Sequence, residues 1–242
     1  MVEHTVKSYE EELKRLHNII VQMGGLAESQ LDAAIRAIVR RDPALAASII
    51  RDDKKVDDLD HEVDTLTTKL LALRQPMAGD LRAIIGAIKI SVDLERIADY
   101  AANIARRAIT LTQASPVKPV YAIPRMARLV QHMIKDVLDA FIARDLDRAL
   151  SVWHADEEVD EMYTSLFREL LTYMIEDPRS ITSCTHLLFV AKNLERIGDH
   201  TTNVAETIHF MVSGKRLLVT RPRGQKPEAE YDMSGIGDEG ND

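Results

Sequence analysis

A twelve-residue phrase occurs twice in this chain, and its two copies lie 100 residues apart. Residues 93–104 and 193–204 share Leu-Glu-Arg-Ile, one Asp and one Asn without a gap. So large an offset indicates a tandem duplication of a unit of about 100 residues rather than a short-period solenoid. The 242 residues of the chain are therefore expected to fold as two related halves.

Each half is predicted to contain three helices joined by short turns. Asp42-Pro43 is typical of an N-cap followed by proline at the first helical position, and Asp145 plays the same capping part in the second half. Apolar residues make up 45% of the chain and aromatic residues only 5%, as expected for helices that pack on one another. The predicted helices span residues 6–41, 43–74, 76–112, 124–143, 146–175 and 178–214. The fold class is therefore all-α, with two tandem three-helix bundles in antiparallel arrangement.

Proline content and charge divide the chain further. We expect residues 1–114 to form the first three-helix repeat and residues 124–214 the second, joined by a proline-rich linker at residues 115–123. Residues 215–242 begin with a basic stretch and end acidic, so we interpret them as a disordered tail. Gly24-Gly25 interrupts the first helical pattern and predicts a bend or a close contact between helices.

Bulk properties exclude several classes of protein. A formal net charge of −8 argues against a nucleic-acid-binding domain, which carries a basic face. The single cysteine, Cys184, excludes an internal disulfide framework and fits a reducing compartment. The N-terminus lacks the apolar core of a secretory signal, and no apolar run is long enough to span a membrane. We therefore expect a cytoplasmic protein.

The repeated phrase places acids on an apolar face. Glu95, Asp99 and Asn103 are four residues apart, and they continue the line of the apolar residues that precede them on the helix. Glu195 and Asp199 do the same in the second half. A carboxylate removed from water needs a basic side chain, a backbone donor or a cation.

The second helix of each half also carries acids at helical spacing, and it is expected to be the antiparallel neighbour of the third. Each half therefore contains two acid-x-x-x-Asp pairs, which would face one another across the helix interface. Oxygen ligands at this spacing suit hard cations such as Mg²⁺, Ca²⁺, Mn²⁺ or iron, and suit zinc less because Cys and His are sparse. The candidate metal ligands are Asp53, Asp57, Glu95, Asp99, Asp156, Asp160, Glu195 and Asp199.

Other interpretations of the polar residues remain open. Asp60 and Asp64 fit a solvated helix face, and Arg96 and Arg196 could neutralise the acids beside them. Asn103 and Asn203 either hydrogen-bond to metal ligands and orient them or form helix–helix hydrogen bonds, and we favour the second interpretation. His200 points about 100° away from Asp199 on the helix, so we interpret it as a surface residue.

A di-iron enzyme is the rival metal reading. Di-iron bundles use two Glu-x-x-His motifs, but this chain has one match, Glu206 to His209, and Arg106 and Ile109 stand at the corresponding positions of the first half. No phosphate-binding glycine loop or nucleophile elbow is present. A carboxylate-bridged metal enzyme and a metal-free structural helical adaptor are kept as alternative functions.

These motifs together resemble the PhoU family, accessory regulators of bacterial phosphate uptake. The resemblance extends from about residue 4 to 214 and depends on Leu-Glu-Arg-Ile-Ala-Asp at 94–99, Leu-Glu-Arg-Ile-Gly-Asp at 194–199 and Arg-Gln-Pro-Met-Ala-Gly-Asp-Leu-Arg at 74–82. One departure is Ala98, where the family phrase and the second copy have glycine. It puts in doubt how closely the helices approach in the first half.

The resemblance implies both a fold and a role. It implies two bundles related by a pseudo-two-fold axis, with iron or zinc bound at the acid-x-x-x-Asp motifs and magnesium or manganese as further candidates. It implies a negative regulator of the phosphate-starvation response, and not an enzyme. The implied partners are the ATPase subunit of the phosphate ABC transporter and a sensor histidine kinase, with membrane association through partners only. A homodimer is also expected.

Overall fold

The computed structural model describes residues 2–117 and 121–217, with side chains from residue 7 onward. Within these ranges the chain is almost entirely helical and contains no strand. Most of the expected tail, residues 218–242, and linker residues 118–120 lie outside the described residues. The elements are α1 (Val2–Arg40), α2 (Pro43–Asp52), α3 (Lys54–Arg74), α4 (Ala78–Gln113), α5 (Ile123–Ala143), α6 (Leu146–Glu176), the 3₁₀ segment η2 (Pro178–Ser180) and α7 (Ile181–Ser213).

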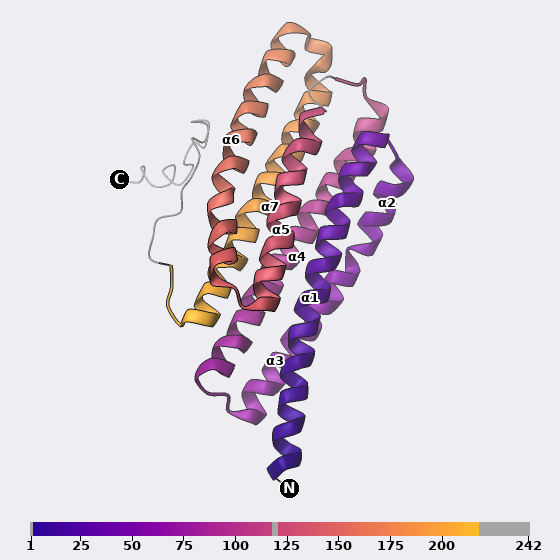
Figure 1. Cartoon of the computed structure of the whole chain (residues 1–242). Coiled ribbons are helices and arrows are strands. Elements are labelled where there is room, and N and C mark those ends of the chain that lie inside the picture. The colour runs from indigo at the N-terminus through magenta and orange to yellow at the C-terminus, as the bar shows by residue number, and fades with distance from the viewer. Residues whose placement is uncertain (1, 118–120, 218–242) are drawn as a thin grey trace, which may run out of the picture.

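The helices form two three-helix bundles that lie side by side (Figure 1). In the first bundle α1 runs up, α2 and α3 together form the second helix and run down, and α4 runs up. In the second bundle α5 runs down, α6 runs up and α7 runs down. The helices α4 and α7 pack along one another in antiparallel orientation and join the bundles. The prediction of an all-α fold with tandem three-helix bundles is confirmed.

Two aspartates begin helices as the sequence predicts. The carboxylate of Asp42 accepts hydrogen bonds from the backbone amides of Ala44 and Leu45 at 3.0 and 2.9 Å. The carboxylate of Asp145 accepts from the amides of Asp147 and Arg148 at 3.0 and 3.1 Å. Each cap satisfies amide groups that have no partner inside the helix, and it thereby fixes where the second helix of each repeat starts.

The prediction of one unbroken helix over residues 43–74 is wrong. The helix is interrupted at Asp53, between α2 and α3, whereas α6 runs unbroken in the second repeat. The interruption is local, because Asp53 keeps helical dihedral angles and its amide still bonds to the carbonyl of Ile49. The apolar periodicity continues through both pieces, and the sequence pattern therefore does not reveal the break. A second difference is that Pro178 opens a 3₁₀ turn rather than α7 itself.

The seam between α4 and α7 forms the centre of the core. One apolar stripe of α4 is fully buried; it consists of Ile90, Leu94, Ile97, Ala101 and Ile104. Gly86 lies directly against the side chain of Met211 on α7, and a β-carbon at this position would overlap it. The core therefore continues from one repeat into the other.

The glycine pair of α1 marks a close contact between helices, one of the two outcomes that the sequence predicts. The helix runs continuously through both glycines. Gly24 lies against the side chain of Leu138 on α5, where a β-carbon would overlap Leu138, while Gly25 faces open space. Gly24 thus lets the first helices of the two repeats approach closely. Across the described ranges, every helix is too short or too polar to cross a membrane.

Candidate functional site

The acid pairs of the first repeat face one another across α3 and α4. Asp53 stands at the start of α3 and is 8% exposed, and one of its carboxylate oxygens, Oδ1, is buried without a hydrogen-bond partner. Burial raises the pKa of Asp53 to about 6, and the negative charges of Asp99 and Asp57 add to the effect while Arg106 opposes it. Asp99 is on α4, so the charge of an α4 acid acts on Asp53 from the neighbouring helix.

Glu95 belongs to the same cluster. Burial raises its pKa, and the charge of Asp99 raises it further, against the opposing charge of Arg96. Asp57 and Asp60 also contribute. Asp60 is therefore not the solvated residue that the sequence suggests, since its Oδ1 atom is buried without a hydrogen-bond partner. Asp64, the other acid assigned to the solvated face, is exposed as expected.

One arginine partly neutralises this cluster. The Arg96 guanidinium lies 3.5 Å from a carboxylate oxygen of Glu95 and 3.3 Å from one of Asp99. Its side chain is 53% exposed, so water screens both ion pairs and each contributes little to stability. Burial is the largest cause of the raised pKa values of Asp53 and Glu95, and the neighbouring carboxylates raise both further against the opposing charges of Arg106 and Arg96.

The acids of the second repeat lie deeper in the protein. Asp156 and Glu195 are each 1% exposed and Asp160 is 4% exposed, whereas Asp199 is half-buried. The Glu195 carboxylate pairs with the Lys192 ammonium at 3.1 Å, and Lys192 also lies over an aromatic ring of α6. The second repeat thus supplies its own cation, and Val92 stands at the corresponding position of the first repeat.

Gly198 explains how α7 accommodates an acid of α6. A β-carbon at this position would lie 3.0 Å from the Asp156 Oδ1 atom and 3.5 Å from the side chain of Val159. Only a residue without a side chain leaves this much room for the carboxylate. Ala98, the equivalent residue of the first repeat, is buried, and the neighbouring helix there is the one interrupted at Asp53.

The candidate ligands have the chemistry that a hard cation prefers, but their side chains are not arranged around a common point. The eight candidate ligands supply only carboxylate oxygens, as Mg²⁺, Mn²⁺ and Ca²⁺ prefer. Within the described ranges, however, no three His, Cys, Asp or Glu side chains converge closely enough to hold one ion. The acids influence one another electrostatically. Their side chains would have to rotate before they could coordinate a metal.

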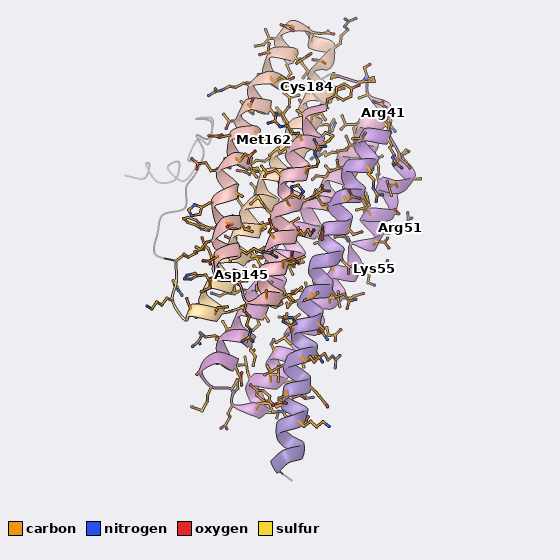
Figure 2. The ribbon with its side chains drawn as sticks, in the orientation of Figure 1. Arg41, Arg51, Lys55, Asp145, Met162 and Cys184 are labelled. Carbon is orange, nitrogen blue, oxygen red and sulfur yellow. The ribbon has the colours of Figure 1, made fainter. Side chains whose placement is uncertain are left out.

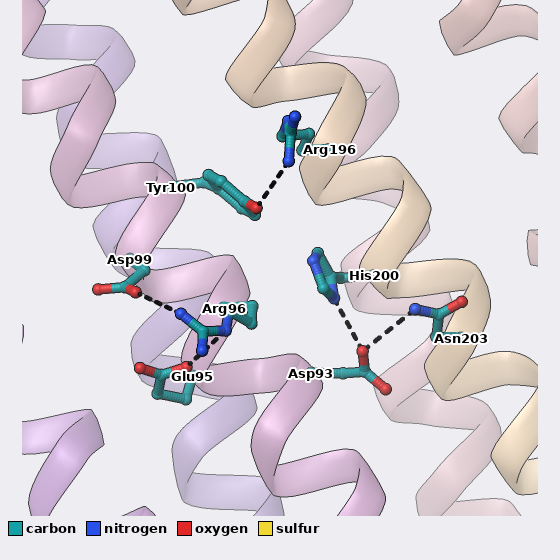
Figure 3. A network of polar contacts seen from close by, with 8 residues as sticks. All are labelled: Asp93, Glu95, Arg96, Asp99, Tyr100, Arg196, His200 and Asn203. Atoms are coloured by element: carbon teal, nitrogen blue, oxygen red, sulfur yellow. Dashed lines mark hydrogen bonds and ion pairs between the residues drawn. The ribbon is translucent and has the colours of Figure 1, made fainter. Parts of the chain in front are cut away.

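A second polar network joins the two repeats at the α4–α7 seam. Asp93 on α4 and His200 on α7 are 2.8 Å apart, and Asn203 donates a hydrogen bond to the same Asp93 oxygen at 3.3 Å (Figure 3). His200 is therefore not a surface residue, since its side chain is only 23% exposed. The expectation that Asn203 bonds to another helix is confirmed.

Two further polar residues of the repeated phrase lie near this network, and only one of them bonds across the seam. Arg196 reaches across the seam to the hydroxyl oxygen of Tyr100 at 3.4 Å, which raises the pKa of the arginine (Figure 3). Asn103, by contrast, accepts from Arg106 on its own helix at 2.6 Å, so it is not the helix–helix group that the sequence suggests.

The isolated Glu-x-x-His match has other contacts. The carboxylate of Glu206 accepts a hydrogen bond from the Trp153 indole at 3.0 Å, and His209 contacts Ser213 and the carbonyl of Lys215 at the end of α7. These residues therefore serve the packing of α6 on α7 and the end of the helix.

Comparison with known proteins identifies the family. A family model described as the PhoU domain matches residues 20–108 and again residues 123–208. The chain belongs to the PhoU family. A protein of Caulobacter vibrioides strain NA1000 named "Phosphate-specific transport system accessory protein PhoU homolog" is 55% identical, over 92% of this chain and 97% of the relative. A Rhizobium meliloti protein with the same name is 47% identical, over 93% of each chain.

Solved PhoU structures have the same fold. The crystal structure of PhoU from Pseudomonas aeruginosa is 39% identical and superposes with a TM-score of 0.83, over 86% of this chain and all of the other. A phosphate transport system regulatory protein PhoU from Streptococcus pneumoniae is 27% identical, with a TM-score of 0.81 over 87% of this chain and all of that one. The assignment of the chain to PhoU therefore holds in both sequence and structure.

Sequence reasoning about this PhoU chain missed two sets of polar contacts. Lys192 lies three residues before Glu195, a spacing that places an ion pair on one helix face, so a recognisable signal existed. Asp93 opens the repeated phrase, but its partners come from the other repeat. Only the register of α4 against α7 could have identified them.

Proposed function

We propose that this protein is an accessory regulator of phosphate transport and a negative regulator of the phosphate-starvation response. Membership of the PhoU family carries the proposal, and the names of the relatives, which describe an accessory protein of a phosphate-specific transport system, support it. The protein acts in the cytoplasm by contact with partners, and it does not catalyse a reaction.

The proposed partners are the ATPase subunit of the phosphate ABC transporter and a sensor histidine kinase. The tandem bundle suits an adaptor because it presents two related but chemically different halves. The acids of the first repeat are more exposed than those of the second, and ion pairs differ between them. Homodimerisation and membrane association through these partners belong to the same proposal.

We further propose that metal ions bind at the carboxylate motifs. The acids concerned are Asp53, Asp57, Glu95 and Asp99 in the first repeat and Asp156, Asp160, Glu195 and Asp199 in the second. The burial of Asp53 and the nearby negative charges of Asp99 and Asp57 support the first site most directly. A bound cation would offset the mutual repulsion of the acids and the cost of their burial. Iron or zinc follows from family likeness, and magnesium or manganese from the oxygen donors.

Metal content tests this assignment. Protein purified without chelators is expected to retain metal detectable by elemental analysis, and the Asp99→Ala plus Asp199→Ala variant is expected to lose most of it. Asp139→Ala plus Asp177→Ala is the matched control, since these two acids pair with arginines elsewhere on the surface. Equal metal content in the two variants would reject the site, and absence of metal from the intact protein would favour a metal-free adaptor.

Gene deletion tests the regulatory role separately. A strain that lacks this protein is expected to express alkaline phosphatase at high phosphate, because a negative regulator of the starvation response has been removed. Complementation with the intact gene should restore repression. If the deletion strain stays repressed at high phosphate, the protein is not a negative regulator in its organism.

A further inference from the structure

A cavity of about 260 Å³ lies where the two repeats meet, and none of the eight candidate metal ligands lines it. The first repeat lines it with residues of α1 and of the start of α4, and the second with residues near the ends of α5 and α7. Its polar side chains are His17, Asp80, Arg82 and Arg144, and the remainder of the lining is largely apolar. The cavity therefore combines positive charge with a surface suited to an apolar group.

The two arginines of the cavity are not used in ion pairs. Arg82 makes one long hydrogen bond, 3.5 Å, to the carbonyl of Met211, and its guanidinium lies beside Gly214. Arg144 makes no side-chain hydrogen bond or ion pair with any described residue. The carboxylate at the cavity, Asp80, already accepts a hydrogen bond from the Tyr9 hydroxyl at 3.1 Å. Guanidinium groups in this state are ready to bind a carboxylate or a phosphate.

The duplication supplies an internal comparison for Arg144. At an offset of 103 residues it corresponds to Arg41, and both arginines have left-handed backbone dihedrals with φ of 54° just before a capping aspartate. Arg41 donates to the carbonyls of Thr112 and Ala114 at the end of α4, at 2.8 and 2.7 Å. In the second repeat α7 instead ends at Gly214, whose amide bonds to the carbonyl of Phe210.

Arg41 therefore holds the end of α4 in the first repeat, whereas its counterpart Arg144 in the second repeat is available to bind a ligand. The two turns lie towards opposite ends of the bundle, with Arg41 at one and Asp145, the residue after Arg144, at the other (Figure 2). His17 lies beside Arg144 in the lining of this cavity. It stacks on Phe141 with ring centroids 4.7 Å apart, and burial together with the charge of Arg144 lowers its pKa.

We propose that this cavity binds a small organic anion, with a phosphate or carboxylate group between Arg82 and Arg144 and an apolar body against the neighbouring aliphatic side chains. Both repeats contribute to the site, so a bound molecule would link them. The proposal is independent of the metal sites and of the regulatory role, and its failure would leave both unaffected.

Binding of phenyl phosphate to the full chain tests the proposal. Calorimetry and NMR are expected to show saturable binding, accompanied by a rise in the pKa of His17 as the anion offsets the charge of Arg144. Inorganic phosphate and phenol, which each lack one half of the ligand, are expected to bind more weakly. Benzoate shows whether a carboxylate replaces the phosphate. Equal affinity for inorganic phosphate and phenyl phosphate would overturn the assigned role of the apolar lining.

Two arginine variants separate binding from stability. Arg144→Gln is expected to raise the Kd for phenyl phosphate at least about tenfold, because it removes a charge-assisted hydrogen bond, and to leave the unfolding temperature unchanged. The matched variant Arg41→Gln is expected to lower the unfolding temperature and to leave the Kd unchanged. Absence of saturable binding at millimolar phenyl phosphate, or binding that Arg144→Gln does not weaken, would overturn the proposal.

Discussion

Replacing Ile97 by alanine is expected to lower the free energy of unfolding by about 2–5 kcal/mol. Ile97 is fully buried on α4, at the seam where the two repeats join. Its truncation removes apolar surface from the core and leaves a cavity that the tightly packed α4 and α7 cannot easily close. Denaturation with urea, followed by far-UV circular dichroism, measures the loss.

Val92→Ala is the matched control for this prediction. Val92 lies on the same helix but is 47% exposed, so the same kind of truncation is expected to change the free energy of unfolding by no more than about 0.5 kcal/mol. If both variants lose the same small amount, the seam is not the tightly packed core that its burial indicates. If Ile97→Ala broadens the transition, the two repeats unfold separately once the seam is weakened.

The sequence predicts the architecture because the determining signals are local or periodic. The repeated phrase predicts the duplication, and Asp42 and Asp145 fix helix starts through hydrogen bonds to amides two and three residues away. The apolar residues of α4 recur at helical spacing, so the sequence predicts this helix and its buried side. The prediction that the acid pairs face one another follows from the antiparallel order of helices within a repeat, and in the first repeat the charge of Asp99 on α4 acts on Asp53.

The remaining features depend on how the repeats dock, which no local pattern encodes. His200 is placed correctly on its helix by the sequence, but its partner Asp93 comes from the other repeat. The interruption at Asp53 escapes detection for a different reason, because its backbone stays helical and the apolar period continues. Whether the acid side chains converge on a metal depends on their rotamers, and the spacing of residues along a helix does not determine these.

Duplication followed by divergence accounts for the chemical differences between the halves. Lys192 neutralises Glu195, whereas Val92 stands in its place in the first repeat. The first repeat uses the exposed Arg96 instead, which pairs with Glu95 and Asp99. Because the pKa of Asp53 in the first repeat is raised to about 6, its protonation is expected to change stability.

Asp53→Asn is expected to remove a pH-dependent loss of stability from the metal-free protein. Folding raises the pKa of Asp53 from an ordinary 3.8 to about 6, so its contribution to stability is fully present below pH 3.8 and disappears as the pH rises through about 6. In chelator-treated protein, the free energy of unfolding of the wild type should fall by about 2–3 kcal/mol more than that of the variant between these limits. Urea denaturation across this pH range measures the difference.

The same pair of proteins links this charge to the proposed cation. Manganese added at neutral pH is expected to stabilise the wild type, because the ion neutralises the carboxylate that burial and neighbouring acids destabilise, and to stabilise Asp53→Asn much less. Asp64→Asn on the same helix is the control, since Asp64 is exposed and should behave as the wild type does. Parallel pH profiles for wild type and Asp53→Asn would show that Asp53 is not under electrostatic strain. Equal stabilisation of both by manganese would place the ion elsewhere.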